Sequence, residues 1–185
     1  MKNVLLLSIL FTSLFAVVHR VPHDRETVQD GIDAAEPGDT VLVDEGIYYE
    51  SLQINKEITL ASYFLLDGII SHRDATIIDC HPDQTGKNAS CVFIRPPSSG
   101  EVISPQVIGF TIQNGVGALA TEQINTDDGL MTDSYYIGGG IMADHCTPVI
   151  KYNYLRDNGV VETADRAPGT RRGGGGAFNN YDGVE

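Results

Sequence analysis

The chain has 185 residues, of which 42% are hydrophobic and 20% are charged, which is enough for one domain with a hydrophobic core and excludes a disordered chain. Acidic residues outnumber basic residues 25 to 12, and the formal net charge at pH 7 is −13. This charge argues against a nucleic acid or an anionic membrane as a partner, since both require clustered Lys and Arg.

Residues 1–20, MKNVLLLSILFTSLFAVVHR, have the pattern of a secretory signal peptide. Lys2 is followed by an apolar run from Val4 to Val18 that is short for a membrane-spanning helix. We therefore assign residues 1–20 to a signal peptide, with cleavage near Ala16 or Val18; an uncleaved anchor is the alternative. No later segment is long and apolar enough to cross a bilayer, so we expect a secreted or cell-surface protein with no membrane span in the mature chain.

Residues 27–39, TVQDGIDAAEPGD, predict a short helix with a marked start and stop. Thr27 is in position to cap the helix, and Pro37-Gly38 ends it. The apolar residues recur at helical spacing on one face: Val28, Ile32 and Ala35. A helix this short is marginal on its own, so this face is expected to cover another part of the protein.

After this helix, apolar and polar residues alternate, which is the pattern of short β-strands. Gly46 turns the chain between the first two strands, VLV and IYYES. The predicted strand segments are residues 41–43, 47–51, 52–54, 58–60, 76–78, 107–112 and 149–155.

Two observations favour a stack of parallel strands over a series of hairpins. Two-residue hairpin turns mostly do not join the segments. In addition, SPQVIGFTIQNG at Ser104 is echoed by TPVIKYNYLRDNG at Thr147, and GGGIMA at Gly138 is echoed by GGGAFN at Gly174. Internal repeats of this kind are typical of solenoid proteins, in which each repeat stacks on its neighbour.

These motifs resemble the N-terminal part of the right-handed parallel β-helix proteins, the pectin-lyase-like superfamily, in its bacterial secreted branch. The resemblance is carried by TVQDGIDAAEPGDTVLVDEGIYYESLQINKEITLAS, ATIIDC, VIGFTIQNG and GGGIMADHCTPVI, and it covers residues 27–176. It implies an all-β fold: a right-handed, single-stranded parallel β-helix (solenoid) over residues 21–185, with a short N-terminal capping helix and a truncated C-terminal end. In such a solenoid, Pro105 and Pro148 would lie about two coils apart.

The resemblance leaves the function open, because this fold carries lyases, hydrolases, esterases and proteins without activity. It implies interaction with an extracellular polysaccharide, with a pectate-lyase-like enzyme acting on acidic glycans as one form of this hypothesis. The alternative is a non-catalytic cell-surface or matrix protein that serves as an adhesin or spacer.

The lyase hypothesis requires a cation, usually Ca²⁺ held by carboxylates, and an arginine or lysine base. The candidate metal ligands are Asp127, Asp128 and Asp133. The candidate catalytic residues are Asp127, Asp128, Arg156 and Arg166. The alternative is that all of them are solvated loop charges.

Tyrosine rings suit the apolar face of a sugar, and several are candidates for stacking on one: Tyr48, Tyr49, Tyr135, Tyr136, Tyr152 and Tyr154. From this group, the predicted substrate-binding residues are Tyr135, Tyr136 and Tyr152, and packing between coils is the alternative. Asparagines are predicted to lie in turns or ladders rather than to bind ligands, among them Asn114, Asn153 and Asn158.

Cys80 and Cys91 flank the polar loop HPDQTGKNAS and form the predicted disulfide, which leaves Cys146 over. Three buried thiols are the alternative, and the absence of a CxxC pair argues against zinc. His145 precedes Cys146. Because neighbouring side chains of a strand point to opposite faces, we expect an exposed histidine beside a buried cysteine.

Overall fold

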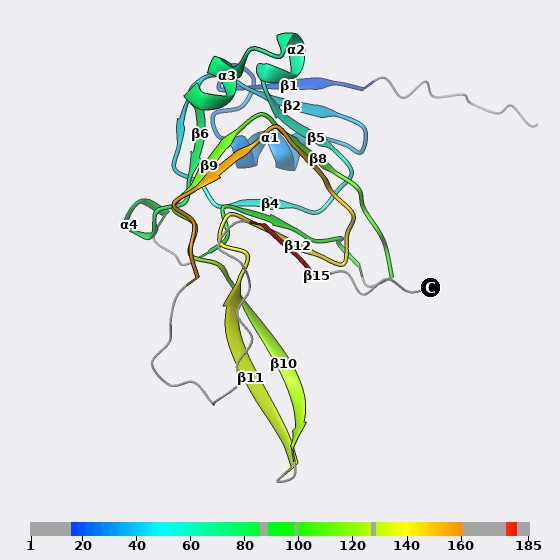
Figure 1. Ribbon diagram of the computed structural model, residues 1–185. Coiled ribbons are helices and arrows are strands. Elements are labelled where there is room, and N and C mark those ends of the chain that lie inside the picture. The colour runs from blue at the N-terminus through cyan, green and yellow to red at the C-terminus, as the bar shows by residue number, and fades with distance from the viewer. Residues whose placement is uncertain (1–15, 86–88, 99, 127–128, 161–176, 181–185) are drawn as a thin grey trace, which may run out of the picture.

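Short strands dominate the structure, and most of them pair in parallel (Figure 1). The computed structural model describes residues 16–85, 89–98, 100–126, 129–160 and 177–180. Within these residues the chain forms three separate parallel sheets, one antiparallel two-stranded sheet and four short helices. The chain contributes strands to the three parallel sheets in turn, an arrangement that is compatible with a β-helix.

Each parallel sheet is built from strands that are far apart in the sequence. The first sheet contains β1 (Val18–Val21), β2 (Thr40–Val43), β5 (Thr59–Ser62), β8 (Gln106–Ile108) and β13 (Val149–Lys151). The second sheet contains β3 (Gly46–Tyr48), β6 (Thr76–Asp79), β9 (Thr111–Gln113) and β14 (Tyr154–Arg156). The third sheet contains β4 (Leu52–Ile54), β7 (Val92–Ile94), β12 (Ile141–Asp144) and β15 (Ala177–Asn180).

The hydrophobic core is formed by all three parallel sheets. Rows of buried aliphatic residues run across each sheet: Val41–Leu60–Val107 in the first, Ile78–Ile112 in the second and Leu52–Val92–Ile141 in the third. These rows belong to one hydrophobic cluster. Side chains alternate along a strand, so the residues directly before and after these row positions point away from the core. Ligands can reach only side chains on this outer face.

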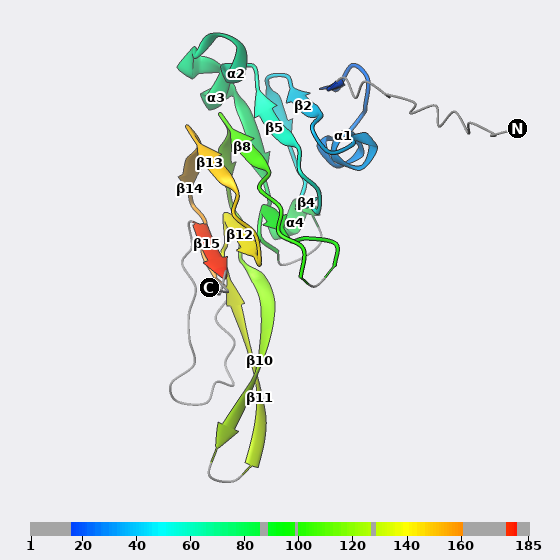
Figure 2. The same ribbon diagram turned by 90° about the vertical axis from the view of Figure 1, so that its right-hand side faces the viewer.

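The predicted helix is confirmed as α1 (Val28–Ala34), which lies at the N-terminal end of the stack of strands (Figure 2). Thr27 caps it, because its side chain accepts a hydrogen bond of 3.0 Å from the N–H of Asp30. The predicted apolar face is buried, with Val28, Ile32 and Ala35 at most 1% exposed. This face packs against β1, β2 and β4.

Two charged side chains hold the ends of α1. Glu50 accepts hydrogen bonds of 2.9 Å from the N–H groups of Val28 and Gln29. The Lys56 ammonium donates bonds of 3.0 Å to the carbonyl oxygens of Asp33 and Ala35. An anion at the start and a cation at the end both complement the helix dipole, so the connections before and after β4 stabilise this short helix.

The predicted fold class is wrong. Instead of a single all-β solenoid with one capping helix, the described residues form three separate parallel sheets and four helices, a mixed α/β pattern. The helices that were not predicted are α2 (Phe64–Asp67), α3 (Ile70–Ala75) and α4 (Pro82–Thr85). They form in connections between strands that were interpreted as loops, and the connection that forms α2 and α3 contains the apolar stretch YFLLDGII. Gly68 ends α2 in the left-handed conformation, with a φ of 72°, which glycine adopts without strain.

A hairpin of β10 (Ala118–Thr126) and β11 (Gly129–Ile137) was also not predicted. Its strands pair antiparallel and project away from the three parallel sheets (Figures 1 and 2). The sequence contained the signal, since strand-forming residues flank an Asp-Gly pair, but the acidic residues there were interpreted as a ligand-binding loop.

The internal repeat is confirmed, but its spacing was interpreted wrongly. β8 and β13 are direct neighbours in the first sheet. The hydroxyl groups of Ser104 and Thr147, which are 43 residues apart in the sequence, lie 2.7 Å apart. Pro105 and Pro148 therefore belong to adjacent layers and are not two coils apart. The β10–β11 hairpin lies between the two copies and accounts for the long spacing.

The predicted asparagine ladder is confirmed at two positions. Asn153 accepts a hydrogen bond of 2.9 Å from the N–H of Phe110 in the adjacent layer. Asn158 accepts one of 2.9 Å from the N–H of Gly115 and donates one of 2.9 Å to the carbonyl oxygen of Ile112. These amides satisfy backbone groups where the chain leaves a strand.

Replacing Asn158 with alanine removes the partners of two backbone groups, on Gly115 and Ile112. We expect the free energy of unfolding to fall by about 1–3 kcal/mol, measured by urea denaturation followed by circular dichroism. Asn125 is exposed on β10, and Asn125→Ala serves as the control, with an expected change within about 0.5 kcal/mol. Equal losses in both variants would contradict the ladder role.

Strand β1 overlaps the predicted signal peptide. It begins at Val18 and pairs with β2 over all four of its residues, so residues 18–20 belong both to the strand and to the segment assigned to the signal. The signal peptide remains a prediction. Among the described residues, none of the helices is long and apolar enough to cross a membrane.

Candidate functional site

The outer face of the second sheet carries polar and aromatic side chains in register. Tyr154 of β14 lies opposite Thr111 of β9, and Arg156 lies opposite Gln113. Leu155, between them, packs against the core. Tyr154 and Arg156 therefore face solvent, and Tyr154 is 49% exposed.

Arg73 of α3 completes this surface. The guanidinium carbons of Arg73 and Arg156 each lie 5.9 Å from the centroid of the Tyr154 ring, which is within the range of a cation–π interaction. Thr111 donates a hydrogen bond of 3.1 Å to the carbonyl oxygen of Arg73 and so holds α3 against β9. A hollow of about 340 Å³ is lined by Arg73, Asp74, Thr111, Tyr154 and Arg156, which we call the arginine–tyrosine site.

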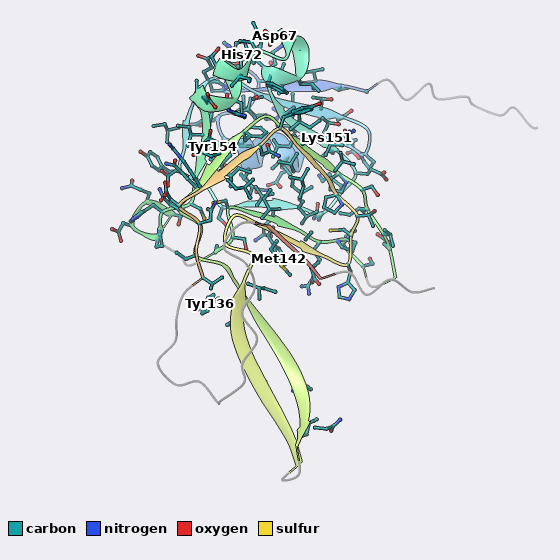
Figure 3. The ribbon with its side chains drawn as sticks, viewed as in Figure 1. Asp67, His72, Tyr136, Met142, Lys151 and Tyr154 are labelled. Atoms are coloured by element: carbon teal, nitrogen blue, oxygen red, sulfur yellow. The ribbon has the colours of Figure 1, made fainter. Side chains whose placement is uncertain are left out.

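His72 fixes the position of α3. Its Nδ1 lies 2.8 Å from a carboxylate oxygen of Glu45, and its Nε2 lies 3.1 Å from one of Asp67 in α2; Figure 3 shows His72 and Asp67 together at the top of the protein. The hydrogen bond with Glu45, reinforced by Asp67, raises the pKa of His72 against the opposing effect of burial. The two carboxylates thus favour the imidazolium, which ties the helix that carries Arg73 to α2 and to the turn between β2 and β3.

A chain of hydrogen bonds orients Arg156. Its Nε donates to the side-chain oxygen of Gln113 at 2.7 Å, and the amide nitrogen of Gln113 donates to Asp79 at 2.6 Å. Asp79 also accepts bonds of 3.0 Å from the side chain of Asn114 and from the N–H of His81. The amide of Gln113 therefore connects the exposed guanidinium of Arg156 to the buried carboxylate of Asp79. Asn114 and the N–H of His81 also donate hydrogen bonds to this carboxylate.

Asp79 is the final acceptor in this series of hydrogen bonds, and it is only 7% exposed. Burial acts to raise its pKa, but the hydrogen bonds from Asn114 and Gln113 and from the N–H of His81 outweigh it and hold the pKa below the ordinary value. The carboxylate is therefore ionised at neutral pH and can keep Gln113 in place.

We expect acid to destabilise the protein by protonating two buried carboxylates. The N–H groups of Val17 and Glu36, together with His19, lower the pKa of Asp39 to about 2, and the pKa of Asp79 is also lowered. Unfolded aspartate titrates at about 3.9. Both groups therefore contribute stability above about pH 4 that is lost as the pH falls through their folded-state pKa values, which are about 2 for Asp39 and below the ordinary value for Asp79. Melting temperatures measured from pH 6 down to 2 should decline below pH 4; a flat profile would contradict this.

The arginine–tyrosine site suits a ligand that joins an anionic group to a ring with an apolar face. Guanidinium groups bind carboxylates and sulfates through paired hydrogen bonds, and an aromatic ring stacks on the C–H face of a sugar. Asp74 lies 2.7 Å from Arg73 and neutralises part of its charge. The neutral amide of Gln113 holds Arg156, which has no salt bridge within the described part of the chain.

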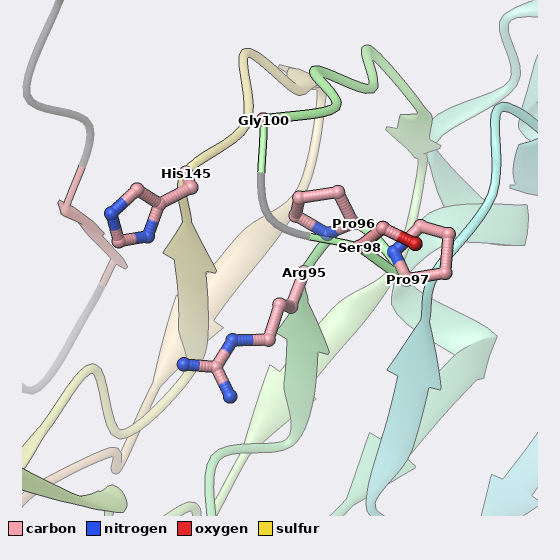
Figure 4. Close-up of a pocket in the computed structure, with 6 residues that line it drawn as sticks. All are labelled: Arg95, Pro96, Pro97, Ser98, Gly100 and His145. Carbon is pink, nitrogen blue, oxygen red and sulfur yellow. The ribbon is translucent and has the colours of Figure 1, made fainter.

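A second hollow, of about 330 Å³, lies where β7 and β12 end (Figure 4). It is lined by Arg95, Pro96, Pro97, Ser98, Gly100 and His145. Asp144, which is 5% exposed, lies 2.6 Å from a guanidinium nitrogen of Arg95 and 2.7 Å from Nδ1 of His145. The predicted exposure is confirmed, because His145 is exposed and Cys146 is fully buried. None of the described residues that line this pocket is a Phe, Tyr or Trp, although the guanidinium carbon of Arg95 lies 5.8 Å from the centroid of the Phe93 ring.

Of the candidate catalytic residues, Arg156 lies in the arginine–tyrosine site. Asp127, Asp128 and Arg166 lie outside the described residues. The backbone of Asp133 belongs to β11 of the hairpin. Nowhere in the described ranges do three or more His, Cys, Asp or Glu side chains gather in a way that could hold a metal ion. The calcium site, which depends on Asp127 and Asp128, stays a prediction.

The predicted substrate-binding tyrosines whose side chains are described, Tyr136 and Tyr152, do not line the arginine–tyrosine site. Tyr136 is half-buried near the end of β11, away from Tyr154 (Figure 3). Tyr152 is 65% exposed and packs against Phe64 of α2, with ring centroids 5.1 Å apart. The backbone of Tyr135 belongs to β11, and its side chain lies outside what the structure describes. The tyrosine that meets two arginines is Tyr154.

All three cysteines are buried free thiols. Cys80 and Cys91 contact each other: the hydrogen bond with the Cys80 thiol, together with burial, raises the pKa of Cys91. Burial raises the pKa of Cys146 to about 11. The structure thus brings the predicted pair together as thiols, and the disulfide itself stays a prediction. The raised pKa values of Cys91 and Cys146 keep these two thiols protonated and unreactive at neutral pH.

Three residues that line the site were not predicted, Arg73, Asp74 and Thr111, and neither were Gln113 and Asp79, which orient Arg156. The repeat contained a signal for Gln113 and Asp79, because aligning the strand ends of ATIIDC, GFTIQNG and NYLRDNG places both in one row with Arg156. Arg73 has no such signal. It lies in a helix between two strands, and its position beside Tyr154 depends on how that connection folds.

Comparisons with protein-family models, with curated proteins and with solved structures find no match for this chain.

Proposed function

We propose that this protein binds an acidic polysaccharide outside the cell, with one charged sugar lying in the arginine–tyrosine site. The observation that carries the proposal is that two guanidinium groups, those of Arg73 and Arg156, lie beside one exposed tyrosine ring, Tyr154. A uronate or a sulfated sugar has the matching chemistry, since its anionic group suits the arginines and its ring suits the tyrosine.

The charge at the site differs from the charge of the whole chain. The net charge of −13 repels a polyanion over most of the surface, so binding requires a local excess of cations. Among the described residues that line the site, the two arginines outnumber the one acidic residue, Asp74. We therefore expect binding that is sensitive to salt and confined to this face.

The side chains of the site are held in place before any ligand arrives. Arg156 is oriented by Gln113 and Asp79, and α3, which carries Arg73, is tied down by His72 and Thr111. Ordered side chains lose less conformational entropy on binding, which favours affinity. The resemblance to the pectin-lyase-like superfamily supports a glycan as the class of ligand.

The test is the affinity of the full-length protein for polygalacturonate, alginate and a sulfated glycan, with neutral dextran as the reference polymer. Arg156→Gln removes a charged hydrogen-bond donor, and we expect it to weaken binding about 10- to 100-fold. Lys151→Gln is the matched control, because Lys151 is an exposed cation on the first sheet, away from Tyr154 (Figure 3). We expect Lys151→Gln to leave the affinity unchanged.

Two results would contradict the proposal. One is the absence of binding to every acidic polymer; the other is an equal loss in both variants, which would indicate unspecific attraction to any surface cation. Absorbance at about 235 nm, recorded with and without Ca²⁺, detects an unsaturated uronate product and so separates the lyase from the non-catalytic adhesin or spacer. An unsaturated product indicates a lyase, whereas binding without product indicates the adhesin or spacer.

A further inference from the structure

The start of the described chain is held by a buried carboxylate. The N–H of Val17 donates a hydrogen bond of 2.7 Å to Oδ1 of Asp39. The other oxygen, Oδ2, lies 3.0 Å from Nε2 of His19 and accepts a bond of 2.9 Å from the N–H of Glu36. Asp39 is 5% exposed, so this carboxylate is largely removed from water.

Val17 is also the point at which the chain joins the first sheet. Its carbonyl oxygen accepts a bond of 2.9 Å from the N–H of Thr40, directly before the ladder of β1 and β2. Cleavage after Val18 or Arg20 would remove residues of β1, against which α1 packs. Ala16 and Val17 are exposed, and a small residue such as Ala16 is typical of the position before a signal cleavage site.

We propose that the chain is processed between Ala16 and Val17, and that the new α-ammonium group of Val17 forms an ion pair with Asp39. The proposal rests on the predicted signal peptide and is independent of the proposed glycan binding. Hydrolysis adds one water molecule across the Ala16–Val17 amide, which a signal-type peptidase cleaves. The C–N bond breaks, Ala16 keeps the new carboxylate, and the amine of Val17 takes up a proton at neutral pH.

The contact between Val17 and Asp39 becomes stronger when the nitrogen is charged. An amide N–H donates one hydrogen bond, whereas an ammonium donates up to three and carries a full positive charge. A distance of 2.7 Å is typical of a bond between an ammonium and a carboxylate. Asp39 stays ionised throughout the physiological pH range, because the N–H groups of Val17 and Glu36, together with His19, lower its pKa to about 2. The site therefore holds an anion in place for the new terminus.

The first test identifies the N-terminus of the full-length protein after export from the cell. Intact mass and N-terminal sequencing should show a chain that begins at Val17. A chain that begins at Val18 or later, or that keeps residues 1–16, would overturn the proposal. Glycan binding is measured separately, so its failure does not affect this result.

The second test measures the ion pair. Two forms of the mature protein are prepared by tag removal, one beginning at Val17 and the other at Ala16, where residue 17 carries an ordinary amide. We expect the form that begins at Val17 to melt about 2–4 °C higher. The difference should disappear when both forms carry Asp39→Asn, because the neutral amide cannot pair with a charge.

If Asp39→Asn does not fold, acetylation of the α-amine of Val17, at a pH where lysines stay protonated, gives an alternative neutral form. It should lower the melting temperature by about the same 2–4 °C. Equal melting temperatures for the free and the acetylated terminus would overturn the ion pair. So would a difference between the Val17 and Ala16 forms that persists in Asp39→Asn.

Discussion

Replacing Gly115 with alanine is expected to lower the free energy of unfolding by about 3 kcal/mol or more, or to prevent folding. A Cβ on Gly115 would lie 1.9 Å from the carbonyl oxygen of Gly139 and 2.9 Å from the Sγ of Cys91. The backbone on both sides of this contact is held by hydrogen bonds and cannot move apart without breaking them. The Gly139 oxygen accepts a hydrogen bond from the N–H of Cys91, and the N–H of Gly115 donates one to Asn158. The layers would have to separate to admit a methyl group.

Gly159 provides a matched control for this substitution. It follows Asn158 as Gly115 follows Asn114, but a Cβ there meets nothing within 4 Å. We expect Gly159→Ala to change the free energy of unfolding by less than about 1 kcal/mol. Urea denaturation of both variants, followed by circular dichroism, measures the contrast. Similar stabilities for the two variants would show that the layers are not packed as tightly as the structure has them.

Replacing Asp79 with alanine is expected to affect both stability and glycan binding. The substitution leaves donors of Gln113, Asn114 and His81 without their common acceptor, and we expect a loss of about 2–4 kcal/mol in the free energy of unfolding. Gln113 is then free to rotate, so Arg156 loses the partner that orients it. We expect the affinity for an acidic glycan to fall several-fold in protein that is still folded.

Asp83→Ala is the control for Asp79→Ala. Asp83 lies in α4, a few residues further along the chain, and its side chain is 85% exposed. It should change neither stability nor affinity appreciably. Affinity is measured under conditions in which circular dichroism shows both variants folded. An Asp79→Ala protein that is destabilised but binds normally would indicate that Arg156 needs no support from this chain of hydrogen bonds.

The features that depend on neighbouring residues could be predicted from the sequence. Helix α1 follows from Thr27 and from three apolar residues at helical spacing, all within one short segment. The exposure of His145 and the burial of Cys146 were predicted from strand alternation and are found, but both residues follow β12 and His145 has a φ of 53°, so a bend of the backbone separates the two side chains. The ladder asparagines follow from their places at the ends of strands.

The features that depend on the connections could not be predicted in this way. Residues 63–75 form α2 and α3, and residues 118–137 form most of a hairpin, although both were interpreted as loops. These connections made the fold class a mixed α/β pattern instead of an all-β solenoid. They also made the interpretation of the repeat spacing wrong, because a long insertion separates Ser104 from Thr147 in the sequence while both stay in adjacent layers.

The sequence by itself therefore determined the capping helix and the strands among residues 41–60, 76–78, 107–112 and 149–155, but not β1, β7, β12, β15 or the hairpin strands. Only the tertiary structure decided that Arg73, Tyr154 and Arg156 share one hollow. The physical reason is that side-chain alternation is a local property of the backbone, whereas the neighbour of a strand in a parallel sheet depends on the path of the chain between them. The entropic cost of closing a connection grows only slowly with its length, so long and short connections are both allowed. The local pattern of the strands therefore does not specify the path of the connections.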